Sequence, residues 1–122
     1  MMMAEDRDWL AREQAARELG SGPDGSSATR LLLRAANDPE GEVRKAAVEA
    51  LGRLRPTRRR LRALLRALSD PQWEVRWAAA RSLGSIGGSS ELVRAALTQA
   101  CADPDAAVAE AARGALSGRE ER

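Results

Sequence analysis

A motif that begins with Asp-Pro recurs along the 122-residue chain. It reads DPEGEVRKAAVEALGRL at 38–54, DPQWEVRWAAARSLGSIG at 70–87 and DPDAAVAEAARGALSG at 103–118. The period is 32 and then 33 residues, and a weaker copy, DRDWLAREQAARELG, begins 32 residues before Asp38. Self-similarity at a period of about 20–50 residues is typical of solenoids and other repeat arrays, so this feature limits the possible folds more than any other.

Each copy has the pattern of an amphipathic helix. In the first full copy Val43, Ala47 and Leu51 recur at helical spacing and predict one apolar face. Asp before Pro predicts an N-cap followed by proline at the first helical position. Glycines near the end of three copies suit helix ends, at Gly20, Gly52 and Gly84.

A second apolar-periodic segment precedes each Asp-Pro pair, at 26–36, 57–68 and 90–102. No segment has the alternation of a strand, so about seven helices are expected. The fold class is all-α, an α-solenoid with a right-handed superhelix of stacked helix pairs. We expect a single domain at 1–118, followed by a charged tail at 119–122. Its units are a half repeat at 6–20 and full repeats at 26–54, 57–87 and 90–118.

The repeated pattern D-P-x-x-x-V-R-x-x-A-x-x-x-L-G resembles HEAT-like repeats, specifically the short bacterial type of the phycobilisome-lyase-like HEAT group. The resemblance covers about 6–118. It implies a helical repeat protein that supplies binding surfaces, with a minority of enzymes and nucleic-acid binders in the family. A HEAT-type lyase or a chromophore-binding accessory protein is therefore a third class of function.

The amino-acid composition argues against common catalytic sites. The chain has no His and one Cys, so a serine or cysteine nucleophile has no His base, and an intrachain disulfide is excluded. HEAT-like hydroxylases carry His-Glu metal pairs, which this chain cannot form. We therefore expect no enzyme, no metal and no cofactor.

The first ten residues, MMMAEDRDWL, have neither the basic nor the apolar segment of a signal peptide. No apolar run approaches the length of a membrane span. The hydrophobic share of 43% and the charged share of 31% are typical of a globular protein. We expect a cytoplasmic protein without membrane contact, a monomer or weak homodimer.

An arginine recurs six residues after each of the first three Asp positions and is replaced by Ala109 in the last copy. Pairing within one repeat would leave the last Asp without its partner. Pairing with the next repeat needs no arginine in the last copy, and charges that are partly buried need partners. We therefore predict an inter-repeat ladder of ion pairs, Arg12 to Asp38, Arg44 to Asp70 and Arg76 to Asp103.

The aromatic residues are three tryptophans, and two of them, Trp9 and Trp73, occupy the same position in their repeats. Trp77 follows Trp73 by one helical turn, and Arg81 follows Trp77 at the same spacing. In repeats of this type the second helix of each pair lines the concave side. Trp and Arg dominate binding hot spots, although a Trp there also suits a cover over the groove between repeats. The predicted protein-binding residues are Trp73, Trp77, Arg81, Lys45, Glu49, Arg17 and Trp9.

The densest charge is RLRPTRRRLRALLR at 53–66, with no acidic residue between Glu49 and Asp70. On a helix the leucines turn inward and an exposed basic stripe remains, made of Arg58, Arg59, Arg62 and Arg66. Such a stripe suits phosphate backbones, but it equally suits a solvated face or an acidic protein, and it has no aromatic residue for base stacking. The sequence thus predicts a non-catalytic protein–protein scaffold or adaptor. Nucleic-acid binding through the Arg53–Arg66 stripe is the alternative.

Overall fold

The computed structural model describes residues 5–22, 25–86 and 90–120. Its described part contains seven helices and no strand. They are α1 (Glu5–Ser21), α2 (Ser26–Ala35), α3 (Gly41–Arg53), α4 (Arg58–Ala67), α5 (Trp73–Ile86), α6 (Glu91–Ala100) and α7 (Ala106–Glu120). The fold is an all-α array of helix pairs. Because α7 continues to Glu120, the tail expected from 119 is helical at its start, and 121–122 lie outside the described residues.

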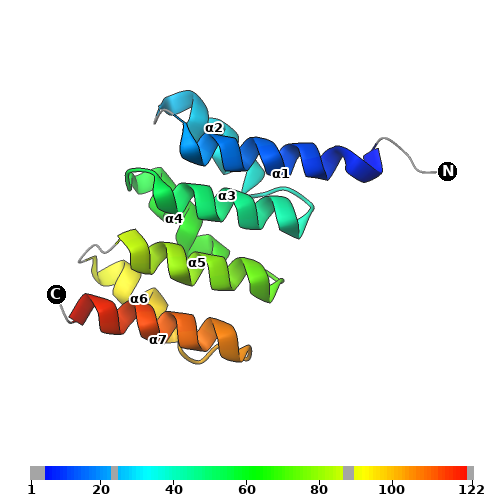
Figure 1. Cartoon of the computed structure of the whole chain (residues 1–122). Helices are drawn as coiled ribbons and strands as arrows, with labels where there is room; N and C mark the ends of the chain where they lie inside the picture. The colour runs from blue at the N-terminus through cyan, green and yellow to red at the C-terminus, as the bar shows by residue number, and fades with distance from the viewer. Residues whose placement is uncertain (1–4, 23–24, 87–89, 121–122) are drawn as a thin grey trace.

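The helices form two layers (Figure 1). The longer helices α1, α3, α5 and α7 stack side by side and run in the same direction, and the short helices α2, α4 and α6 lie behind them. Each long helix contacts its neighbours in the layer far more extensively than α2 contacts α4. The long helices therefore make the main contact between successive repeats.

Equivalent positions of successive repeats contribute the same residue types to the core. Leu32, Leu64 and Leu97 are completely buried at equivalent positions of the short helices. Val43, Val75 and Val108 are the equivalent buried residues of the long helices. Each repeat thus contributes the same side chains to a continuous apolar layer, as nearest-neighbour stacking requires.

The role expected for the Asp-Pro pair needs correction. The N-cap of α3 is Glu40, so Pro39 precedes the helix and is not its first residue. Asp38 instead accepts a hydrogen bond from the Glu40 amide at 2.9 Å, and Asp70 and Asp103 accept the equivalent bond from the residue two positions on. The carboxylate thus holds a short turn before the helix, in the way Asx turns do.

The glycines expected at helix ends have a different role. Gly20, Gly52 and Gly84 lie inside α1, α3 and α5. A Cβ built on Gly20 would meet the Cβ of Ala50 at 2.6 Å, and one on Gly84 would meet the Cβ of Ala115 at 2.7 Å. Real Cβ atoms do not approach this closely, so the missing side chains allow adjacent long helices to touch.

Candidate functional site

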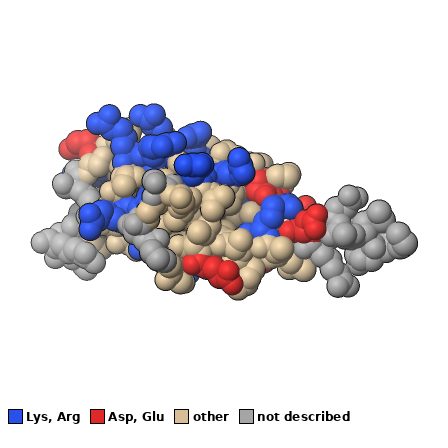
Figure 2. Space-filling view, turned by 90° about the horizontal axis from the view of Figure 1, so that it is seen from above, with Lys and Arg blue, Asp and Glu red and all other residues tan. Residues whose placement is uncertain are grey.

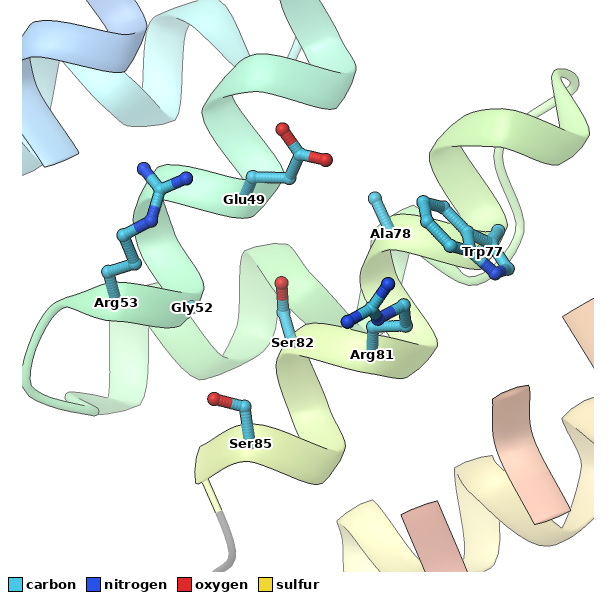
Figure 3. Close-up of a pocket in the computed structure, with 8 residues that line it drawn as sticks. All are labelled: Glu49, Gly52, Arg53, Trp77, Ala78, Arg81, Ser82 and Ser85. Atoms are coloured by element: carbon cyan, nitrogen blue, oxygen red, sulfur yellow. The ribbon is translucent and has the colours of Figure 1, made fainter. Parts of the chain in front are cut away.

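A groove lies between α3 and α5, on the side that carries Trp77 (Figure 3). Its volume is about 240 Å³. Glu49 and Arg53 of α3 and Trp77, Arg81 and Ser85 of α5 line it, together with the small residues Gly52, Ala78 and Ser82. Successive polar residues lie four apart on each helix, so each helix presents one row of side chains along the groove.

The groove is narrow because α3 and α5 approach closely at its base. Gly52 faces Ser82, and a Cβ on Gly52 would lie 2.6 Å from the Cβ of Ser82. The Ser82 hydroxyl donates to the carbonyl of Val48 at 3.2 Å, which satisfies this buried hydroxyl within the helix contact. The base of the groove is therefore fixed by backbone packing.

Trp77 is half-buried and packs with one part against the core. Two cations lie close to its ring: the Arg81 guanidinium carbon is 4.9 Å from the ring centroid and the Lys45 ammonium is 5.5 Å from it. Both distances are within the range of a cation–π interaction, roughly 6 Å. The indole is thus held in place while part of it faces solvent.

The structure brings together four of the predicted protein-binding residues, namely Lys45, Glu49, Trp77 and Arg81. The others lie apart from the groove. Trp73 begins α5 and is 42% exposed, and Trp9 is half-buried on α1. Arg17 pairs with Glu13 on α1 at 2.5 Å, and this hydrogen-bonded partner raises the pKa of Arg17.

The inter-repeat ladder links successive repeats through three ion pairs. Arg12, Arg44 and Arg76 pair with Asp38, Asp70 and Asp103 at 2.7, 2.8 and 2.9 Å. Arg44 also donates to the backbone carbonyls of Asp38 and Pro39, at 2.8 and 3.0 Å, and Arg76 makes the equivalent bonds. Each of these two arginines therefore joins the Asp-Pro turn of its own repeat to the carboxylate of the next.

One structural residue was missed by sequence reasoning. Arg60 is 3% exposed and donates from Nε to the Thr29 hydroxyl at 3.0 Å and from Nη1 to the Arg55 carbonyl at 2.8 Å. Its position one helical turn before the buried Leu64 is the signal that could have separated it from the exposed arginines. It joins α4 to α2.

Comparison with known proteins identifies the repeat. A family model described as HEAT repeats matches residues 2–62 and 55–117. The chain belongs to the HEAT-repeat family. No curated protein sequence matches it. The likeness to the bacterial lyase-like HEAT group stays a prediction.

A solved structure of human deoxyhypusine hydroxylase, in complex with glycerol, is similar to this HEAT-repeat chain. The TM-score is 0.74 and the sequence identity is 23%. The similarity covers 98% of this chain and 46% of the hydroxylase chain, so this chain spans about half the length of that protein. At this identity the likeness shows the fold.

The prediction that the chain is not an enzyme is wrong, because an enzyme, human deoxyhypusine hydroxylase, has the same repeat fold. The absence of His argues only against catalytic sites that need a histidine. Within the described residues, no three His, Cys, Asp or Glu side chains group in a way that could hold a metal ion. In the same residues, each helix is too short or too polar to cross a membrane.

Proposed function

We propose that this HEAT-repeat chain binds a protein partner through the Trp77 patch, defined as Lys45, Glu49, Trp77 and Arg81. HEAT repeats are generally protein-interaction scaffolds, which supports the class of partner. The observation that carries the proposal is the half-buried indole with two cations close to its ring at an open groove. Trp73, one helical turn earlier on the same helix, does not line this groove.

The Trp77 patch offers a partner an anchor that is already ordered. The indole is already positioned by the core and the two cations, so binding costs little side-chain ordering. An apolar group from the partner would complete the burial of the ring, and an acidic group would pair with Arg81. Trp and Arg are the residue types that carry most of the energy at interfaces.

Affinity capture from the source organism, with quantitative mass spectrometry, tests the proposal. The baits are the wild type, Trp77→Ala, Arg81→Glu and the control Trp9→Ala, which removes a half-buried indole outside the groove. Recovery of the partner should fall with the first two variants and stay unchanged with the control. Truncation of such an anchor typically costs about 2 kcal/mol or more, so the Kd should rise at least about tenfold.

Folding must be measured beside binding, because Trp77 also packs on the core. Arg81 is exposed and loses only a cation–π contact, so Arg81→Glu should lower the free energy of unfolding by about 1 kcal/mol or less. A partner that binds Arg81→Glu as tightly as the wild type contradicts the proposal. Equal losses from Trp9→Ala and Trp77→Ala contradict it as well.

A further inference from the structure

The short helices α2 and α4 present positive charge without any negative charge. Six of their arginines are exposed, and we call this set the arginine face: Arg30, Arg34, Arg58, Arg59, Arg62 and Arg66. No acidic residue occurs at 25–37 or at 50–69. The face thus extends beyond the stripe on α4 to the neighbouring helix.

The small net charge of the chain conceals this separation. Segments 25–37 and 50–69 contain nine of the 20 basic residues and none of the 18 acidic ones. The rest of the chain holds eleven basic against 18 acidic residues, a net charge of −7 that offsets +9 to give +2. Figure 2 shows a dense group of Lys and Arg side chains along one edge, with acidic side chains mostly elsewhere.

The two helices that carry the arginine face are joined by a buried contact. Arg60 of α4 donates to the Thr29 hydroxyl of α2, which keeps the helices side by side. Exposed arginines recur every four residues on each helix, at 30 and 34 and at 58, 62 and 66. Four residues of helix rise about 6 Å, so each row spaces its positive charges regularly.

These guanidinium groups are not neutralised within the described part of the chain. None of the six has a described carboxylate within ion-pair distance. A hollow of about 550 Å³ is lined by Arg59, Arg62 and Arg66 and also contains Asp38 and Asp70. Both carboxylates are already bound by the inter-repeat ladder, so they leave the arginines available.

We propose that the arginine face binds the phosphate backbone of double-stranded nucleic acid. Guanidinium groups match phosphate geometry and stay charged at all relevant pH values. Single-strand binding commonly uses aromatic platforms, whereas α2, α4 and α6 contain no aromatic residue and the tryptophans lie on α1 and α5. Contacts limited to phosphates fix position without reading base sequence.

Fluorescence anisotropy with two labelled duplexes of unrelated sequence tests this surface, at salt concentrations from about 50 to 200 mM. The variants are Arg34→Glu/Arg62→Glu, which changes one arginine in each row, and the charge-matched control Arg94→Glu/Arg113→Glu on α6 and α7. All four side chains are exposed, so both variants should melt near the wild-type temperature. If the first fails to fold, Arg34→Gln/Arg62→Gln replaces it.

The wild type should bind both duplexes equally. The slope of log K against log salt should be steep, about −5 for five or six neutralised phosphates. The variant of the arginine face should lose more than tenfold in affinity at about 100 mM salt and about two units of slope. The control should lose less than threefold.

Several outcomes would overturn the proposal. They are no duplex binding by the wild type at 50 mM salt, and equal losses in the two double variants. Tighter binding to single strands of the same length, to vesicles with anionic lipid or to poly-glutamate would also overturn it, since these stand for the other partners a basic surface could take. Because Trp77→Ala leaves the arginine face intact, it should bind duplex like the wild type, which separates this test from that of the Trp77 patch.

Discussion

Arg44 donates to acceptors in two repeats at once. Its Nε and Nη2 bind the two oxygens of Asp70, at 2.8 and 3.1 Å, while Nη1 binds the carbonyls of Asp38 and Pro39. The side chains of Arg44 and Asp70 are only 12% and 9% exposed. A partly desolvated pair of this kind fixes geometry, because each charge depends on the other to remain buried.

Arg44→Ala should therefore lower the free energy of unfolding by about 2–4 kcal/mol, since it leaves the Asp70 carboxylate without a counter-charge and two carbonyls without a donor. Arg12→Ala is the matched control, because the Arg12 side chain in the equivalent pair is 43% exposed. The control should cost much less. Urea unfolding measures both, and equal losses would show that burial does not set the strength of the ladder.

The ladder also predicts how stability depends on pH. Partial burial raises the pKa of Asp103, but hydrogen bonds from Arg76 and the Asp105 amide, with the positive charge of Arg76, outweigh it and hold the pKa below its usual value. The same balance, with Arg12 and the Glu40 amide, lowers the pKa of Asp38. The unfolded chain therefore binds these protons more readily than the folded chain.

Stability from these two groups is fully present above the unfolded pKa, about 3.9, and is lost as pH falls through the lower folded values. Urea unfolding at several pH values between about 6 and 3 should show a decline for the wild type. In Asp103→Asn the decline should be shallower, although the variant starts from lower stability because Arg76 loses its partner. Parallel curves for the two proteins would contradict this assignment.

At the scale of elements, the contact between adjacent long helices depends on small residues. Gly52 meets Ser82, and Gly84 meets Ala115, each at distances that exclude a further methyl group. A Cβ built on Gly114 of α7 would meet no atom within 4 Å. Glycine is thus a packing requirement at these two positions and has no packing role at Gly114.

Gly52→Ala should destabilise the fold by about 1–3 kcal/mol, because its Cβ would overlap the Cβ of Ser82 and force α3 and α5 apart. Gly114→Ala should instead stabilise by up to about 1 kcal/mol, since alanine favours the helix and meets nothing. Thermal unfolding of the two variants gives the comparison. A stabilising Gly52→Ala would mean that the helices adjust freely at this contact.

Sequence reasoning predicted the elements well where one repeat could be compared with another. Because Val43 and Val75 occupy equivalent positions in their repeats, the buried face of the long helices could be predicted. Ala109, which replaces the arginine in the last copy, distinguished inter-repeat from intra-repeat pairing of Arg with Asp. The glycines were misassigned because a glycine near a helix end suits both a cap and a close helix contact. The hydrogen-bond partner of Arg60, Thr29, lies 31 residues away, so no local pattern could have identified it.

At the scale of the whole molecule, the two layers carry different surfaces. The arginine face lies on α2 and α4 of the short-helix layer, and the Trp77 patch lies on α3 and α5 of the long-helix layer. The sequence indicated both by composition, but it could not show which tryptophans share a groove or that α2 adds two arginines beside α4. Those relations depend on how neighbouring repeats are placed in space.

The most direct test of the central claim, that the partner protein binds at the Trp77 patch, is site-specific photocrosslinking in cells of the source organism. A photoreactive amino acid replaces Ser85, an exposed residue that lines the groove, and in a second protein replaces Arg113, exposed on α7. Binding at the Trp77 patch predicts a discrete covalent adduct with a protein from position 85, lost when Trp77→Ala is added, and none from position 113. An adduct that forms equally at both positions, or that survives Trp77→Ala, would show that the partner does not bind at this patch.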